Sequence, residues 1–291
     1  MTILVTGSTG TIGSRIVERL AAEGASVKAL VRAGKQTRFP KDAQLVVGDM
    51  TDVQSMRAAL NGTDTLFLLN AVAPDELTQA LLTLDLAVEA GIKRIVYFSV
   101  FNGALFADVP HFTAKHAIEQ AIDARAIPAT VLRPSYFFQN DLNLKQAILD
   151  HGVYPMPIGS AGVAMVDVGD IVKVAVAELL RRERAAGPLP RTVIEVVGPD
   201  TLTGNDVAAI WSRETGGTVT YAGDDLDAFE SRMSQFAPAW QVRDMRMMFR
   251  SFHKYGMAPG WQAREILADI IGGPGKSYAD FAHETVMAWR N

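Results

Sequence analysis

Cysteine is absent from this 291-residue chain, so disulfides, thiolate metal sites and cysteine nucleophiles are excluded. The chain also lacks any run of about 20 consecutive apolar residues, the length that a membrane-spanning helix requires. Its five histidines are scattered, without the close spacing that is typical of metal ligands. We therefore expect a protein that has no metal centre and does not enter a membrane.

Charge of neither sign dominates the chain. Lys and Arg number 28 and Asp and Glu number 32, which gives a formal net charge of −4. Nucleic-acid binding relies on many phosphate contacts from Lys and Arg, so this mildly acidic balance argues against it. The chain opens on a strand-like run instead of a charged segment followed by an apolar one, so we predict no secretion signal and a cytoplasmic location.

A glycine-rich segment follows the first strand-like run. It consists of Gly7, Ser8, Thr9, Gly10, Thr11, Ile12 and Gly13, and an amphipathic stretch comes next. A strand, a glycine turn and a helix start in this order form the setting in which a loop binds a pyrophosphate, because glycines admit the phosphates and the helix start offers free N–H groups. A tight turn without a ligand is the alternative. The spacing Gly-x-x-Gly-x-x-Gly resembles that of the short-chain dehydrogenase/reductase superfamily, particularly its extended and atypical branches.

The second apparent strand, residues 26–31, ends at Arg32. An acid that binds the ribose 2′-hydroxyl is expected near this point, about 20 residues beyond the loop. Arginine instead predicts a 2′-phosphate, and so NADP(H) in place of NAD, because a guanidinium can stack on adenine and pair with phosphate oxygens. No acid occupies residues 30–36, and Lys35 and Arg38 follow closely. A solvated basic loop is the alternative for these three side chains.

The first 150 residues alternate short apolar strands with helical periodicity, a pattern that is typical of a parallel sheet with crossover helices. We predict an α/β fold, a Rossmann-type doubly wound parallel sheet with a smaller, partly helical C-terminal cap. Residues 1–150 form the expected NADP-binding domain, to which a strand near residues 192–197 is added. Residues 151–291 form mainly the substrate cap.

The pair Asp49-Met50 follows the third strand, where the edge of the adenine would lie. The carboxylate can accept a hydrogen bond from the adenine amino group, and the methionine can pack against the ring. Asp49 as the cap of the next helix is an equal alternative, with Thr51 and Asp52 as further capping candidates.

The segment His111-Phe-Thr-Ala-Lys115 carries most of the mechanism. Its two end residues share a helix face that Ile118 and Ile122 continue, so Lys115 is predicted to point at the sheet and the cofactor. An unpaired buried charge is costly, and the ribose hydroxyls and phosphates of a dinucleotide would partner this lysine. A surface lysine that extends outward is the alternative.

His111 occupies the place at which a conventional short-chain dehydrogenase has the tyrosine of Tyr-x-x-x-Lys. This departure weakens any claim of alcohol dehydrogenation or sugar epimerisation, which need the phenol. Histidine can still deliver a proton near neutral pH. Lys115 and His111 are therefore the catalytic candidates, and a packed residue at the helix start is the alternative for His111.

Taken together, these features resemble the NmrA-like atypical short-chain dehydrogenases, and the resemblance runs over nearly the whole chain. It rests on Arg32, on Lys115 without the tyrosine, and on the run Val131-Leu-Arg-Pro-Ser-Tyr-Phe-Phe-Gln-Asn140 after the sixth strand. It also includes Asn70 and Ser99 at strand ends and Val166–Asp170. The resemblance implies cofactor contacts from Gly7 to Ile12 and at Arg32, Asp49, Met50, Asn70, Ser99, Lys115, Ser135, Tyr136, Phe137 and Phe138. Phe137 or Phe138 is expected to line the nicotinamide pocket, with packing in the core as the alternative.

Several helices are also expected from their patterns. One covers residues 74–90, with Leu77, Leu81, Leu84 and Val88 on one stripe, and Asp170 and Thr203 are the expected caps of two later helices. Met245, Met248, Phe249 and Phe252 recur at helical spacing. This second pattern favours a core-facing helix, and a pliable wall for a flat apolar substrate is the alternative.

Known NmrA-like proteins include quinone oxidoreductases, triphenylmethane-dye reductases, isoflavone and benzylic ether reductases, and NADP-sensing regulators. The resemblance therefore implies an NADPH-dependent reductase of a small, planar, apolar electrophile such as a quinone, which accepts hydride with little acid assistance. A regulatory NADP(H) sensor is the main alternative. An extended short-chain enzyme acting on nucleotide sugars is disfavoured by the missing tyrosine. The oligomeric state stays open, with a homo-oligomer as one option.

Overall fold

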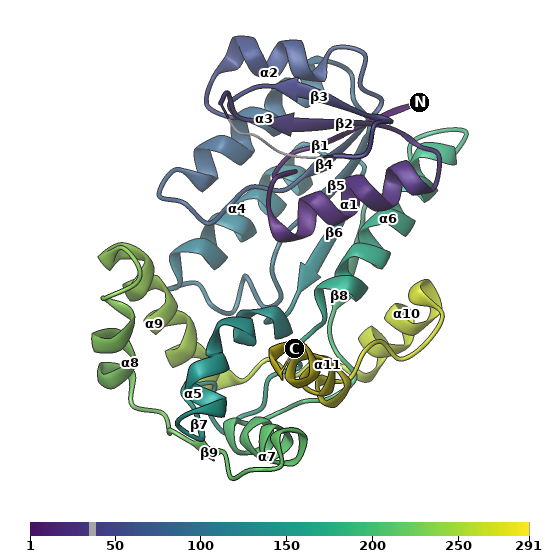
Figure 1. Ribbon diagram of the computed structural model, residues 1–291. Helices are drawn as coiled ribbons and strands as arrows, with labels where there is room; N and C mark the ends of the chain where they lie inside the picture. Colours follow the sequence, from purple (N-terminus) through teal and green to yellow (C-terminus); the bar gives the residue numbers. More distant parts are fainter. Residues whose placement is uncertain (35–38, 291) are drawn as a thin grey trace. The chain divides into compact units, whose positions relative to one another are not determined.

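The main sheet has the strand order β3-β2-β1-β4-β5-β6-β8 (Figure 1). The computed structural model describes residues 1–34 and 39–290. The strands of this sheet are β1 (Thr2–Val5), β2 (Ser26–Val31), β3 (Ala43–Val47), β4 (Thr65–Leu68), β5 (Arg94–Phe98), β6 (Ala129–Pro134) and β8 (Thr192–Val196). The pairings from β3 through β6 are parallel. The order reverses between β1 and β4, which is the place where open parallel sheets bind ligands.

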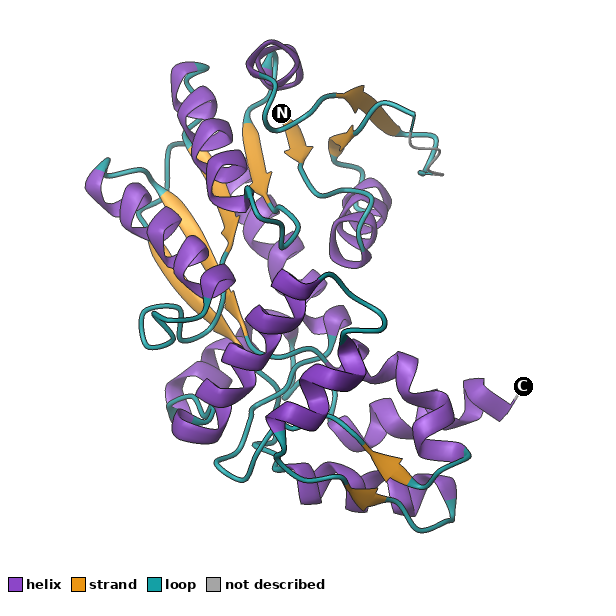
Figure 2. Cartoon of the chain, turned by 90° about the vertical axis from the view of Figure 1, so that its left-hand side faces the viewer, coloured by secondary structure: helices purple, strands orange, loops and turns teal. Residues whose placement is uncertain are grey.

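Helices cover both faces of this sheet (Figures 1 and 2). They are α1 (Thr11–Ala22), α2 (Val53–Leu60), α3 (Glu76–Glu89), α4 (Pro110–Ala124) and α6 (Val168–Arg184). On one face, Leu66 and Tyr97 of the strands belong to a core that also contains Met56 of α2, Leu84 of α3 and Ile118 of α4. The helices α1 and α6 lie on the other face. The predicted doubly wound α/β fold is confirmed.

Contacts divide the chain into two units. Unit 1 comprises Met1–Gly103, Thr113–Arg133 and Ile171–Ile194, and unit 2 comprises Ala104–Phe112, Pro134–Asp170 and Glu195–Asn291. Neither unit is a continuous segment, because the chain leaves the sheet after β5 and again after β6 to contribute to unit 2. Unit 1 contains most of the sheet and the loops that follow β1, β2, β3 and β4.

Unit 2 contains the helical C-terminal part that the sequence predicts. Its elements are η1 (Phe138–Leu144), α5 (Lys145–Leu149), β7 (Val153–Tyr154), α7 (Gly204–Thr215), β9 (Thr220–Tyr221), α8 (Leu226–Met233), α9 (Ala239–Tyr255), α10 (Trp261–Ile271) and α11 (Tyr278–Arg290). In α9, Met248, Phe249 and Phe252 are buried and Met245 is half-buried, so the core-facing interpretation is confirmed for three of the four predicted residues. Among the described residues, we find no helix that is long and apolar enough to cross a membrane.

Of the two helix caps predicted from the sequence, one is confirmed and the other is wrong. Thr203 caps α7 in a full capping box with Asp206, as predicted. The expectation for Asp170 is wrong, because α6 begins at Val168 and already includes this residue. Asp167 instead accepts a 2.7 Å bond from the Gly169 amide. The Asp170 carboxylate accepts the Lys276 amide at 2.6 Å, a partner that is distant in sequence.

The buried face of α3 also differs from the predicted stripe. Leu84 is buried, but Leu77, Leu81 and Val88 are 38%, 39% and 37% exposed. The inward face instead contains Ala80, Thr83 and Ala87 beside Leu84. Small residues let a helix approach a sheet closely, so the larger aliphatic side chains occupy the flank.

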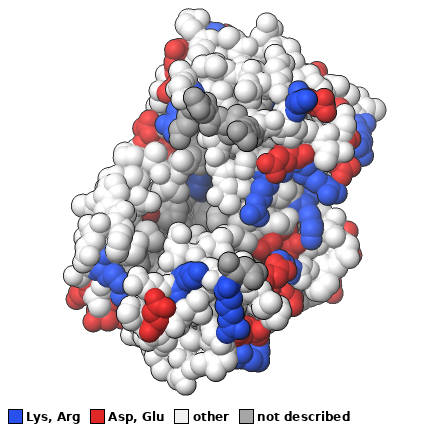
Figure 3. Space-filling model, viewed as in Figure 1, with Lys and Arg blue, Asp and Glu red and all other residues white. Residues whose placement is uncertain are grey.

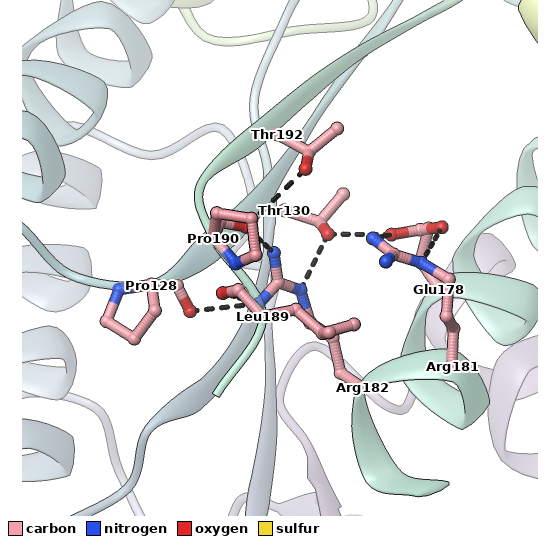
Figure 4. A network of polar contacts seen from close by, with 8 residues as sticks. All are labelled: Pro128, Thr130, Glu178, Arg181, Arg182, Leu189, Pro190 and Thr192. Atoms are coloured by element: carbon pink, nitrogen blue, oxygen red, sulfur yellow. Dashed lines mark hydrogen bonds and ion pairs between the residues drawn. The ribbon is translucent and has the colours of Figure 1, made fainter. Parts of the chain in front are cut away.

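A buried arginine joins α6 to the amino-terminal end of β6 (Figure 4). The guanidinium of Arg182 donates to the carbonyls of Pro128, Leu189 and Pro190 at 2.8–3.1 Å and to the Thr130 hydroxyl at 2.7 Å. The Thr130 hydroxyl in turn donates to Glu178 at 2.7 Å. Burial lowers the pKa of Arg182 to about 10, with the charge of Glu178 opposing the effect. Because its donors reach acceptors on two segments, residues 128–130 and 189–190, this side chain joins both of them to α6 within unit 1.

The carboxyl group of Asp141 is fully buried in unit 2. Asp141 accepts hydrogen bonds from the hydroxyls of Tyr278 at 2.6 Å and Tyr154 at 3.2 Å, and Tyr278 accepts one from the indole of Trp211 at 2.9 Å. Burial raises the pKa of Asp141 from 3.8 to about 7, and the two hydroxyl donors oppose this rise. At pH values between these two, the folded protein is therefore expected to hold a proton on Asp141 that the unfolded chain releases.

This carboxyl group should make the stability of unit 2 depend on pH. Between about pH 4 and 7 the native state binds one proton more than the unfolded state, so stability falls as pH rises, by up to about 1.4 kcal/mol per pH unit. Asp141→Asn should remove that slope, which urea unfolding from pH 4.5 to 8 can measure. Tyr278→Phe removes a hydrogen-bond donor that lowers the pKa of Asp141. In this variant the decline of the free energy of unfolding with pH should therefore extend to higher pH. If the free energy of unfolding changed with pH in the same way in wild type and Asp141→Asn, the raised pKa of Asp141 would be contradicted.

Candidate active site

The glycine loop at the end of β1 is fixed to its neighbouring strands by two hydroxyl groups. Thr6 donates to the Leu69 carbonyl at 2.7 Å and accepts the Leu69 amide at 2.8 Å. The buried Ser8 donates to the Leu30 carbonyl at 2.6 Å. The Ser8 hydroxyl is thus engaged within unit 1, and what this residue can offer a ligand is its backbone amide.

The loop opens onto the amino terminus of α1. Thr9, Gly10 and Thr11 are exposed, Gly10 is the N-cap, and no side chain caps the helix. The first turn also contains no acidic residue. The uncapped amides and the helix dipole favour an anion, so the chemistry of this loop fits the pyrophosphate of a dinucleotide.

Glycine is required at two positions of the loop by close contacts. A Cβ on Gly13 would lie 2.2 Å from the carbonyl oxygen of Gly7, and one on Gly7 would lie 2.8 Å from that of Leu69. Gly7 also has a φ of +60°. These glycines let α1 start directly against the end of β1, which leaves space above the loop for phosphate groups.

Arg32 and Asp49 come together at the carboxyl ends of β2 and β3. Arg32 is exposed directly after β2. Asp49 accepts bonds from the amide and hydroxyl of Thr51 at 2.8 and 2.7 Å, which lower the pKa of its carboxyl, and the positive charge of Arg32 contributes. The cap of α2 is Asp52, so the capping alternative for Asp49 is wrong. Met50 is half-buried beside it, while Lys35 and Arg38 lie outside the described residues.

Asn70 and Ser99 follow β4 and β5, and both are buried with partners in unit 1. The Asn70 amide donates to the Glu76 carbonyl at 3.0 Å. The Ser99 hydroxyl donates to Glu119, which also receives three hydrogen bonds from the guanidinium of Arg133. Glu119 was not expected from the sequence, because a glutamate in the middle of a helix is usually solvated. The hydrogen bond to Glu119 fixes the Ser99 side chain, so the Ser99 hydroxyl is not freely available to a ligand.

Lys115 is 7% exposed, so the prediction that it points inward is confirmed. Burial lowers the pKa of its ammonium group, and the negative charge of Glu76, at the start of α3, partly opposes this effect. Glu76 is buried too and was missed from the sequence. Its position directly after Pro74-Asp75 indicated only the start of a helix. Both side chains are buried in unit 1, and the charge of Glu76 acts on the ammonium group of Lys115.

The remaining predicted residues belong to unit 2. Ser135 and Tyr136 are buried, and the ring of Tyr136 packs on Phe249 and Phe252 at 6.0 and 5.7 Å. Phe138 lies in the core, where its ring contacts Tyr278 and Phe281 at 5.1 and 5.4 Å.

The half-buried Phe137 is therefore a better candidate than Phe138 for contact with a ligand.

His111 precedes Lys115 by one turn of α4 and contacts the buried Asp244 of α9, a residue that the sequence did not indicate.

Acidic and basic side chains are interspersed on the face shown in Figure 3, and much of that face is uncharged. In the described part of the chain we find no cluster of three or more residues suited to bind a metal ion. The predicted absence of nucleic-acid binding stays a prediction.

Comparison with known proteins identifies the family. A profile of the NmrA-like family matches residues 1–269. An NAD(P)H azoreductase of Xenophilus azovorans is 30% identical over 99% of both chains. An NADPH-dependent quinone oxidoreductase of Escherichia coli, solved with NADPH, is 22% identical with a TM-score of 0.82 and full coverage of both chains. A triphenylmethane reductase of Citrobacter sp., solved with NADP(H), is 19% identical with a TM-score of 0.82 over 98% of this chain and 100% of its own. The chain belongs to the NmrA-like family.

Proposed function

We propose that this protein is an NADPH-dependent oxidoreductase that reduces small, planar, apolar acceptors, with quinones as the leading class. The observation that carries the proposal is the loop of unit 1, an uncapped helix start behind close-packed glycines with Arg32 where an acid would select NAD. The azoreductase that is 30% identical over nearly the full length supports the reductase assignment.

The residues proposed to bind NADPH follow the carboxyl edge of the sheet. The amides of residues 8–13 would bind the pyrophosphate, and Arg32 the 2′-phosphate. Asp49 would accept from the adenine amino group, with Met50 against the ring. Asn70, Lys115 and the segment Ser135–Phe138 would lie towards the nicotinamide end. The bound cofactor supplies the hydride, so the protein has to bind, orient and exclude water.

Lys115 is proposed to hold the nicotinamide ribose. Its ammonium group is buried beside Glu76, and burial lowers its pKa, so it gains from any hydroxyl acceptor brought by a ligand. Lys115 also stands four residues after His111, the spacing at which the superfamily has its tyrosine and lysine. The histidine takes the place of the phenol that alcohol dehydrogenation and sugar epimerisation need.

The test is steady NADPH oxidation over a panel of quinones, azo dyes and triphenylmethane dyes. We expect turnover with several planar acceptors and little activity with NADH. Tight NADPH binding without turnover on any acceptor would overturn the reductase proposal and favour the regulatory NADP(H) sensor instead. Oxidation or epimerisation of a sugar nucleotide would overturn the choice of substrate class.

A further inference from the structure

One carboxylate contacts His111 at two points. Asp244 of α9 accepts the backbone N–H of His111 through Oδ1 at 3.1 Å, and its Oδ2 contacts the Nδ1 atom of the imidazole. Asp244 is buried, and the side chain of His111 is 14% exposed. Both residues belong to unit 2, although 133 positions separate them in the chain.

This contact decides which nitrogen of the imidazole carries a proton. A carboxylate only accepts hydrogen bonds, so Nδ1 must be the protonated nitrogen and Nε2 is the one turned away from Asp244. The ring of Phe112 stands edge-on to the imidazole at 4.6 Å, and Phe112 packs on Phe106 at 5.1 Å. The imidazole is therefore held in one tautomer and one orientation.

We propose that Asp244 is the positioning residue for His111 and that His111 delivers a proton from Nε2 to acceptors whose reduction requires one. This inference rests on the proposed function and names the proton source for the same site. The reduction of a quinone consumes one hydride and one proton. Hydride transfer brings both electrons and, on its own, would leave a hydroquinone monoanion. The Nε2–H bond of the imidazolium breaks as the hydride arrives and its proton forms the second O–H bond, which leaves a neutral imidazole with its Nδ1–H on Asp244, and solvent returns the proton.

A purely structural role for Asp244 is the competing explanation. Its carboxylate accepts an amide at the start of α4, where a negative charge also interacts favourably with the helix dipole. Under this explanation, removing Asp244 would disturb the segment and lower every activity by a similar factor. If His111 is a proton donor, the loss of activity should instead differ between acceptors, because some acceptors take up a proton on reduction and others do not.

A triphenylmethane dye supplies the matched control substrate. Its carbocation accepts hydride at carbon and becomes the neutral product without taking up a proton, whereas a quinone needs one. We therefore compare kcat for a quinone and for a cationic triphenylmethane dye in the wild type, Asp244→Asn, Asp244→Glu and His111→Gln. Asp244→Asn keeps an oxygen that can accept the His111 amide but removes the carboxylate.

The ratio of the quinone rate to the dye rate should fall by about 100-fold or more in Asp244→Asn and His111→Gln, within the range of general acid catalysis. The KM for the quinone should change little, and Asp244→Glu should recover part of the ratio. An equal fall with both acceptors would overturn the proposal in favour of the structural role. If the wild type reduces dyes but no quinone, the proton-donor role is wrong and the reductase proposal stands. If it reduces neither, the proposed function itself fails.

A second measurement does not depend on activity. Long-range ¹⁵N–¹H spectra of the histidines report which ring nitrogen is protonated, and His111→Gln assigns the signal. Wild type should show His111 with a protonated Nδ1, and Asp244→Asn should lose that preference. A wild-type spectrum in which the neutral His111 is protonated at Nε2 alone would overturn the proposal whatever the kinetics.

Discussion

Replacing Gly13 by alanine is expected to abolish NADPH binding and to lower the free energy of unfolding by about 3 kcal/mol or more, because the overlap involves backbone. The added Cβ would lie 2.2 Å from the Gly7 oxygen and 2.8 Å from the Ser8 Cα. Relief requires α1 to move away from the end of β1, and the amides of the loop then no longer converge on one anion. Fluorescence titration with NADPH and urea unfolding measure the two effects.

Two further glycine variants separate folding from binding. At Gly10 a Cβ would meet only the Gly7 oxygen, at 3.4 Å, so Gly10→Ala should fold normally. It should nevertheless bind NADPH weakly, since the methyl group would occupy the exposed side of the loop. Gly217→Ala, whose Cβ would be 3.9 Å from the Thr215 hydroxyl in unit 2, should change neither property. Wild-type NADPH affinity in Gly13→Ala would refute the assignment of the loop.

Arg32→Asp is expected to reverse the cofactor preference, with the ratio of NADPH to NADH affinity falling by about 100- to 1000-fold. Removing the guanidinium loses a charge-assisted bond to the 2′-phosphate, and such bonds contribute about 1.5–3 kcal/mol. The new carboxylate would repel the phosphate and accept from the 2′-hydroxyl of NADH. It would also approach Asp49, whose carboxyl now has the positive charge of Arg32 nearby. Calorimetry with both dinucleotides measures the ratio.

The control for this charge reversal lies at the opposite edge of the sheet. Lys93 is exposed immediately before β5, so Lys93→Asp changes the net charge of unit 1 equally but away from the carboxyl edge. Its affinity ratio should stay within about two-fold of wild type, because exposed charges beyond about 10 Å are largely screened at ordinary salt. A ratio that is unchanged in Arg32→Asp would show that the 2′-phosphate is bound elsewhere.

The strands and their terminal residues could be predicted from the sequence because their signals are local. Each parallel strand has its own apolar run and ends in a polar residue or glycine. Because the carboxyl ends of parallel strands lie at one edge of a sheet, the residues that follow them lie at that edge too: Gly7, Arg32, Asp49, Asn70 and Ser99. Lys115 was predictable for the same reason, since its inward direction follows from the stripe that Ile118 and Ile122 continue.

The buried acids could not be predicted, because their environment depends on partners far along the chain. Asp244 meets His111 across 133 positions and Asp141 meets Tyr278 across 137. Nothing in the neighbouring sequence distinguishes either from a solvated acid. The face of α3 was misassigned for a related reason. Close packing on the sheet selects Ala80 and Ala87 for the inward side, whereas a hydrophobic pattern favours the larger Leu77 and Leu81.

Direct transfer of hydrogen from NADPH to a carbon acceptor tests the central claim most directly. NADPH labelled with deuterium at C4, on one face or the other, would be mixed with the protein and a cationic triphenylmethane dye, and the product analysed by mass spectrometry. If the protein transfers hydride directly, one of the two labelled forms of NADPH should give a product with one deuterium at its central carbon. The other form should give a product with none. Tight binding of NADPH with no labelled product from either form would contradict it.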